Sequence, residues 1–124
     1  MISGITGAHI LLYSENPEAD RAFFRDVLNF RSVDAGRGWL IFALPPAEAA
    51  IHPSDGDRSQ SGDKLARADL YLMCDDLAAL IKSLQAKGVK CPTPEKERWG
   101  IKTTIQLPSG AEIGVYQPAH PIAI

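Results

Sequence analysis

Three side chains that can bind a cation or move a proton lie in segments that we expect to be strands. They are His9, Glu48 and Asp69. Imidazole and carboxylate groups suit a borderline divalent ion, and a carboxylate can also act as a general base. If both carboxylates point into one interior with His9, their charges require a cation or a raised pKa. The alternative is structural: a hydrogen-bonded histidine inside a sheet, and carboxylates on exposed strand faces.

Aromatic side chains in the second half of the chain could line the same interior. Alternation along a strand places Tyr71 on the face of Asp69, and Tyr116 on the face of Glu112. Trp99 could stand at the rim. The alternative is that these aromatic side chains only pack within a sheet. The candidate ligand-binding residues are therefore His9, Glu48, Asp69, Tyr71, Trp99, Glu112 and Tyr116.

Two helices and several short strands must position these residues. Asn16 is a suitable N-cap, Pro17 suits the first helical position, and an apolar stripe follows at helical spacing up to Leu28. A second helix is entered at residues 75–76 and stops at Gly88. Runs of strand-forming residues predict strands over 6–13, 30–35, 39–44, 47–52, 67–74, 90–94, 101–107 and 111–116.

The order strand-helix-strand-strand-strand therefore occurs twice. The same interval separates His9 from Asn16 and Asp69 from Asp76, and the two pairs are offset by 60 residues. A repeat of this kind predicts two similar units that pack side by side and enclose a cleft. The predicted boundaries are about 1–52 for the first module, about 53–66 for a polar linker, about 67–118 for the second module and 119–124 for a tail.

Composition excludes several classes of protein. The 124 residues are 45% hydrophobic and 23% charged with a net charge of −2, which is typical of one globular domain and gives no basic surface for nucleic acid. No stretch reaches the roughly 18 apolar residues of a membrane span. The first residues do not resemble a secretory signal, and Cys74 and Cys91 lack zinc-site spacing. We therefore expect a cytoplasmic protein with free thiols, and no nucleic-acid or membrane partner.

Four phrases of the sequence resemble the vicinal oxygen chelate superfamily, which contains the glyoxalase I, bleomycin-resistance, fosfomycin-resistance and extradiol-dioxygenase proteins. The first phrase runs from AHILLY into NPEADRAFFRDVLNF, over residues 8–30. The others are AEAAIH at 47–52, DLYLMCDDL at 69–77, and WG followed by LPSGAEI within 99–113. Together they cover nearly the whole chain, and their order makes the resemblance specific.

The resemblance implies an α+β fold in which two βαβββ modules form a half-open β-cup. It also implies a homodimer and, in metal-dependent members, one divalent ion held at four positions. His9, Glu48 and Asp69 match the first three positions, so these residues are the implied ligands of a Ni, Zn, Mn or Fe ion. Gly114 matches the fourth position and has no ligating group. This glycine either widens the floor of the cup or relieves crowding in the strand.

Three functions remain open at this point. The first is the binding of a small organic ligand in the cup beside a degenerate metal site, which Gly114 favours. The second is a metal-dependent lyase, isomerase or dioxygenase acting on a substrate with vicinal oxygens. The third is an interaction module with a vestigial cup. We predict the first function, and whether the protein is an enzyme stays open.

Overall fold

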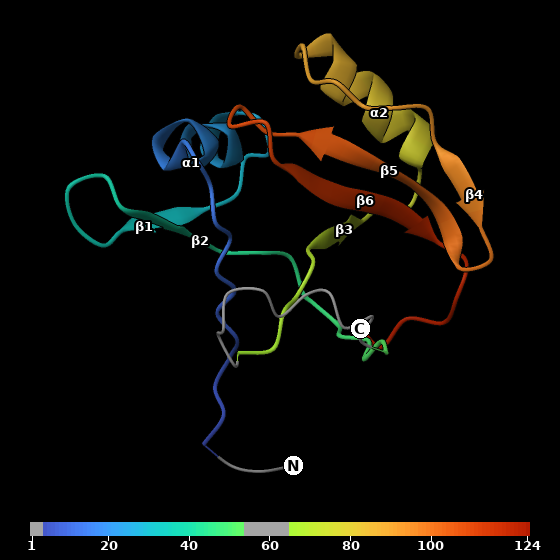
Figure 1. Cartoon of the computed structure of the whole chain (residues 1–124), viewed down its shortest axis with the longest axis horizontal. Helices are drawn as coiled ribbons and strands as arrows, with labels where there is room; N and C mark the ends of the chain where they lie inside the picture. The colour runs from blue at the N-terminus through green and yellow to red at the C-terminus, as the bar shows by residue number, and fades with distance from the viewer. Residues whose placement is uncertain (1–3, 54–64) are drawn as a thin grey trace.

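The computed structural model describes residues 4–53 and 65–124, so the predicted linker falls largely outside the described residues. The chain is a mixed α+β structure in which both helices lie above the extended segments and the C-terminus (Figure 1). The predicted α+β class is therefore confirmed. The elements in chain order are α1 Pro17–Asp26, β1 Ser32–Asp34, β2 Leu40–Phe42, β3 Tyr71–Met73, α2 Leu77–Ala86, β4 Glu95–Glu97, β5 Gly100–Gln106 and β6 Glu112–Pro118.

Both helices begin where local capping chemistry predicts. The Asn16 side chain accepts a hydrogen bond from the Ala19 amide at 3.3 Å, and the Asp76 side chain accepts one from the Ala79 amide at 3.1 Å. Each cap satisfies a backbone donor that the first helical turn leaves unpaired. The helices span 17–26 and 77–86, so the predicted offset of 60 residues is confirmed for them. Neither helix has the length or the apolarity to cross a membrane, within the residues that the structure describes.

The second module forms a complete βαβββ unit. Its four-stranded sheet has the order β3-β6-β5-β4, with β3 parallel to β6 and the other two pairs antiparallel. One face of this sheet packs against α2, and alternate residues point to the opposite face. The buried hydrophobic side chains are Phe24, Leu77, Ile81, Leu84, Val89, Ile105, Leu107, Ile113 and Val115. Since only Phe24 comes from the first module, the core belongs mainly to the second.

The first module differs from its prediction. Among the described residues it contains only the antiparallel pair β1–β2, and the segments predicted as strands over 6–13 and 47–52 are not strands. No backbone hydrogen bond joins residues 5–13 to another described residue. Apolar side chains are therefore left exposed in this segment: Ile10, Leu11, Leu12 and Tyr13. Strand-forming residues favour an extended backbone, but a strand also needs a partner at hydrogen-bonding distance.

The strand predicted over 90–94 is also misplaced. The structure forms β4 at Glu95–Glu97 instead, paired with the start of β5. Pro92 and Pro94 have no amide proton to donate to a ladder, which explains why pairing begins only after them.

One buried carboxylate joins the two modules. Asp20 of α1 is only 7% exposed and accepts hydrogen bonds from the backbone amide and the hydroxyl of Ser109, at 3.0 and 2.7 Å. Ser109 lies in the turn between β5 and β6, 89 residues away in sequence. A second link runs from the Lys87 amine to the Val27 carbonyl at 3.2 Å. These contacts fix α1 against the second module.

Candidate functional site

Three aromatic side chains meet on the sheet face that points away from α2. Tyr71 comes from β3, Trp99 precedes β5, and Tyr116 comes from β6. Their ring centroids are 5.2–6.3 Å apart and their planes cross at 80–87°. The His120 ring lies 5.8 Å from that of Tyr116. We term these four residues the aromatic cluster.

The aromatic cluster is partly open to solvent. Tyr71 is 43% exposed and Trp99 is 38% exposed. Large aromatic side chains that gather at a surface supply apolar contact area, and Tyr and Trp add a polar group to it. The structure thus brings together three of the predicted ligand-binding residues, and the arrangement can hold a planar ring by stacking or edge-to-face contact.

Gly114 determines how the Tyr71 ring lies. Tyr71 and Gly114 are register partners in the parallel β3–β6 pair. A Cβ atom placed on Gly114 would overlap the Tyr71 ring. The ring therefore occupies the space that a side chain at position 114 would fill. The space is not an empty cup floor, as the wider-floor interpretation of this glycine expected.

One end of the aromatic cluster is polar and includes a residue of the first module. The Tyr116 hydroxyl lies 2.9 Å from Nε2 of His120, and Nδ1 of His120 lies 2.7 Å from the Pro121 carbonyl. The Ala123 amide donates to Oε1 of Glu48 at 2.6 Å. Burial raises the pKa of Tyr116, and the negative charge of Glu48 raises it further. The tail thus contacts both residues, Tyr116 through His120 and Glu48 through Ala123.

The aromatic cluster also has a cation beside it. The Lys102 amine lies 5.6 Å from the centre of the Trp99 ring, within the range of a cation–π interaction. The same amine is 3.8 Å from a Glu97 carboxylate oxygen. Lys102 is the register partner of Tyr116 in the β5–β6 pair, so this cation and the phenol come from neighbouring strands.

The structure does not gather the other predicted residues at this place. His9 is exposed in the extended segment before α1, and Asp69 is exposed just before β3. Glu112 is exposed at the start of β6 and lines a separate hollow with Gln85 and Cys91. These three residues therefore stay predictions as parts of a site.

The implied divalent ion does not fit the arrangement of this single chain. No group of three or more His, Cys, Asp or Glu residues that could hold a metal occurs in residues 4–53 and 65–124. At the fourth implied position, the Tyr71 ring takes the space of a ligand side chain on Gly114. The ligand set of His9, Glu48 and Asp69 stays a prediction from resemblance, and we derive no reaction step through a metal.

Sequence reasoning missed His120. This residue reaches Tyr116 because the chain turns back after Pro118, where the Ala119 amide donates to the Trp99 carbonyl at 2.8 Å. A residue two positions beyond the end of a strand carries no signal for such a contact, because the turn depends on Trp99, which lies before another strand.

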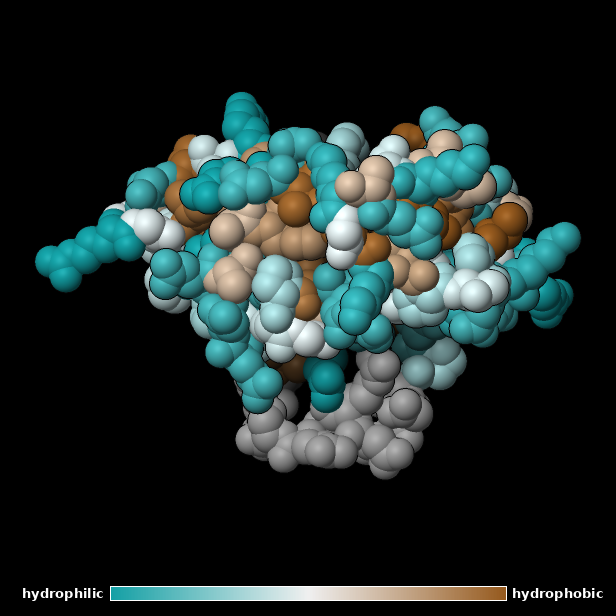
Figure 2. Space-filling view, turned by 90° about the horizontal axis from the view of Figure 1, so that it is seen from above, coloured by the Kyte–Doolittle hydropathy of each residue, from teal (hydrophilic) through white to brown (hydrophobic). Residues whose placement is uncertain are grey.

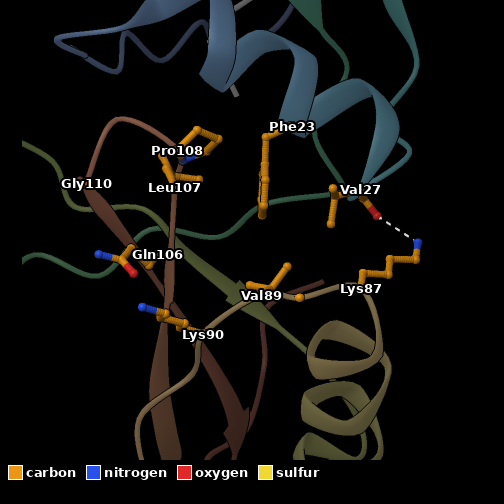
Figure 3. A pocket seen from close by; sticks show the side chains of 10 residues that line it. Phe23, Val27, Lys87, Val89, Lys90, Gln106, Leu107, Pro108 and Gly110 are labelled. Atoms are coloured by element: carbon orange, nitrogen blue, oxygen red, sulfur yellow. Dashed lines mark hydrogen bonds between the residues drawn. The ribbon is translucent and has the colours of Figure 1, made fainter.

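A second hollow lies between α1 and the second module. Its volume is about 420 Å³, and Phe23 of α1 and Val27, the C-cap residue after α1, point into it toward Val89 (Figure 3). Seen from above, this side of the molecule shows apolar side chains gathered between polar ones (Figure 2). The hollow shares no residue with the aromatic cluster, and none of the predicted site residues lines it.

The family model of the Glyoxalase/Bleomycin resistance protein/Dioxygenase superfamily matches residues 7–115. Among curated proteins, none matches the chain significantly.

Several solved structures are similar in fold. The antibiotic binding protein TnmS3 from Streptomyces sp. CB03234 is 24% identical, with a TM-score of 0.65 over 95% of this chain and 100% of that one. A lactoylglutathione lyase from Agrobacterium tumefaciens is 19% identical, with a TM-score of 0.61 over 94% of both chains. A glyoxalase/bleomycin resistance protein/dioxygenase from Nocardioides is 14% identical, with a TM-score of 0.59 over 99% of this chain and 93% of that one.

Proposed function

The chain belongs to the Glyoxalase/Bleomycin resistance protein/Dioxygenase superfamily, and from this membership we propose that it binds a small planar aromatic molecule on its aromatic cluster. The supporting observation is the set of mutually perpendicular, partly exposed rings of Tyr71, Trp99 and Tyr116 on the open face of the sheet. Such surfaces bind planar molecules through apolar burial and ring contacts. The similarity in fold to an antibiotic binding protein is compatible with this use of the sheet face.

Titration with a planar aromatic probe tests this proposal. We expect 2-methoxynaphthalene to bind the parent protein and to bind Trp99→Ala and Tyr71→Ala each about ten-fold more weakly, because each variant removes one ring contact. Trp39→Ala is the matched control, since Trp39 is an exposed tryptophan of the first module outside the aromatic cluster. Ligand-observed NMR measures the affinities. Equal affinities in all four proteins, or no binding to the parent, would overturn the proposal.

We also propose that the chain forms a homodimer. The extended segment 5–13 has exposed apolar side chains, and its backbone forms no hydrogen bond to another described residue. A strand edge of a second copy can satisfy both.

Light scattering after size-exclusion chromatography measures the dimer directly. We expect a particle of about twice 13.4 kDa. Leu12→Asp should shift it to the monomer, because a carboxylate would enter the apolar interface, whereas Glu15→Asp should leave the mass unchanged. A parent protein that is monomeric at high concentration would contradict this proposal without affecting the ligand proposal.

A further inference from the structure

We propose that Glu48 and the Tyr116 hydroxyl form a hydrogen-bond-acceptor subsite, which selects aromatic ligands that carry a donor group, a hydroxyl or an amine. This inference rests on the proposed aromatic-ligand function and adds the polarity of the ligand to it. It follows from where the protons lie at the polar end of the aromatic cluster.

The hydrogen bonds of His120 fix the direction of the Tyr116 hydroxyl. Nδ1 of His120 lies 2.7 Å from the Pro121 carbonyl oxygen, which can only accept, so Nδ1 carries the proton. In the neutral imidazole, Nε2 is then the acceptor, and the Tyr116 hydroxyl donates to it over 2.9 Å. The single phenolic proton is thereby used. The Tyr116 oxygen can only accept from a further partner.

Glu48 adds a second acceptor. Oε1 of Glu48 receives the Ala123 amide at 2.6 Å, and no hydrogen bond to Oε2 is made within the residues that the structure describes. An ionised carboxylate is an acceptor only and has lone pairs beyond those used here. The Ala123 amide that binds Oε1 lies three residues after His120, which pairs with the Tyr116 hydroxyl, so one short tail segment holds both the carboxylate and the phenol. The negative charge of Glu48 is also one of the two causes that raise the pKa of Tyr116.

The cation of the cluster is engaged with other groups. Lys102 is the register partner of Tyr116, but its amine lies against the Trp99 ring and 3.8 Å from a Glu97 carboxylate oxygen. Within the described residues, no contact joins a positively charged side chain to Glu48. A hydroxyl or amine on a ring that lies against Tyr71 and Trp99 supplies the missing donor. A hydrogen bond to a charged acceptor is among the stronger ones in proteins.

A matched pair of probes tests the inference. 2-Naphthol and 2-methoxynaphthalene share one ring system, but only the first has a donor. We expect 2-naphthol to bind the parent protein about ten-fold more tightly than its methyl ether, which corresponds to one charge-assisted hydrogen bond. In Glu48→Ala this preference should fall to about two-fold, while the affinity for the methyl ether stays unchanged. Glu18→Ala, which removes an exposed glutamate elsewhere, should keep the full preference.

His120→Phe tests the proton assignment. Without the imidazole acceptor, the Tyr116 hydroxyl can donate to the ether oxygen of 2-methoxynaphthalene. The methyl ether should therefore bind more tightly, and the affinity ratio between 2-naphthol and its methyl ether should decrease. Equal affinities of the two probes in the parent protein, or a preference that survives Glu48→Ala, would overturn the inference while the proposed function stands. If neither probe binds, the proposed function fails, and the inference fails with it.

A titration of the ligand-free protein tests the interaction of Glu48 with Tyr116 independently of ligand binding. In the tyrosinate absorbance titration of the parent protein, one of the three tyrosines should ionise at the highest pH, and Tyr116→Phe should remove that step. Glu48→Gln removes a negative charge that disfavours the phenolate, so it should move the step to lower pH. An unchanged titration in Glu48→Gln would show that the carboxylate does not face Tyr116, and would overturn the acceptor subsite.

Discussion

Gly100→Ala is expected to lower the free energy of unfolding by about 4 kcal/mol, the largest effect that we predict for a single methyl group in this chain. Gly100 opens β5 in register with Pro118, and its φ of +154° is one that residues with a side chain rarely adopt. A Cβ atom here would overlap the backbone carbonyl oxygen of Gln117 and lie 3.2 Å from the Tyr116 ring. Because the overlapping atom belongs to the paired strand, the β5–β6 ladder itself must shift.

Urea denaturation of Gly100→Ala and Gly36→Ala separates the two causes of this loss, which are the backbone strain of a positive φ and the overlap with the paired strand. Gly36 also has a positive φ, +135°, but a Cβ atom there would meet no heavy atom within 4 Å. Its replacement should therefore cost only about 1–2 kcal/mol of backbone strain. Equal losses in the two variants would show that the close approach of β6 is not what requires glycine at position 100.

Asp20→Ala is expected to lower the free energy of unfolding by about 3 kcal/mol. The substitution removes a buried carboxylate that accepts from both the amide and the hydroxyl of Ser109, and it leaves the amide without its acceptor. Hydrogen bonds to a charged group contribute about 1.5–3 kcal/mol each, with incomplete additivity when they share a partner. Since Asp20 joins α1 to the β5–β6 turn, α1 should also detach more readily.

The measurement for Asp20 combines urea denaturation with amide hydrogen exchange in α1. Glu18→Ala is the matched control, because it removes an exposed carboxylate from the same first turn and should cost at most about 1 kcal/mol through the helix dipole. Asp20→Asn keeps an acceptor and should fall between the two. A loss in Asp20→Ala no greater than that in Glu18→Ala would contradict a structural role for the carboxylate.

The helices were predictable because their signals are local. Asn16 with Pro17, and Asp76 with Gly88, mark ends that depend on groups within one helical turn, and the structure places both helices accordingly. The repeat offset of 60 residues followed from those same caps. The strands were less predictable: strand-forming residues were present over 6–13, but the chain supplies no partner for this segment among its described residues.

The candidate site divides in the same way. Tyr71 and Tyr116 could be named as ligand-binding residues because alternation assigns side chains to strand faces, and Trp99 was expected at the rim. The contact between the Tyr71 and Tyr116 rings depends on the parallel pairing of β3 with β6, which joins residues more than 40 positions apart. His120 carried no signal, and Glu112 shares a strand with Tyr116 yet lines a different hollow.

By itself, therefore, the sequence determined the two helices, their repeat, a net charge without a basic excess and the residue types available for a site. Caps, apolar stripes and net charge are properties of neighbouring residues or of composition, so they need no tertiary partner. Only the tertiary structure decided that the Tyr71 ring fills the space above Gly114, and that the tail brings His120 to Tyr116 and binds Glu48 through Ala123. Those contacts join residues 43 to 75 positions apart, or depend on a turn made against another strand, because packing and hydrogen-bond partners are set by three-dimensional proximity and not by order in the chain.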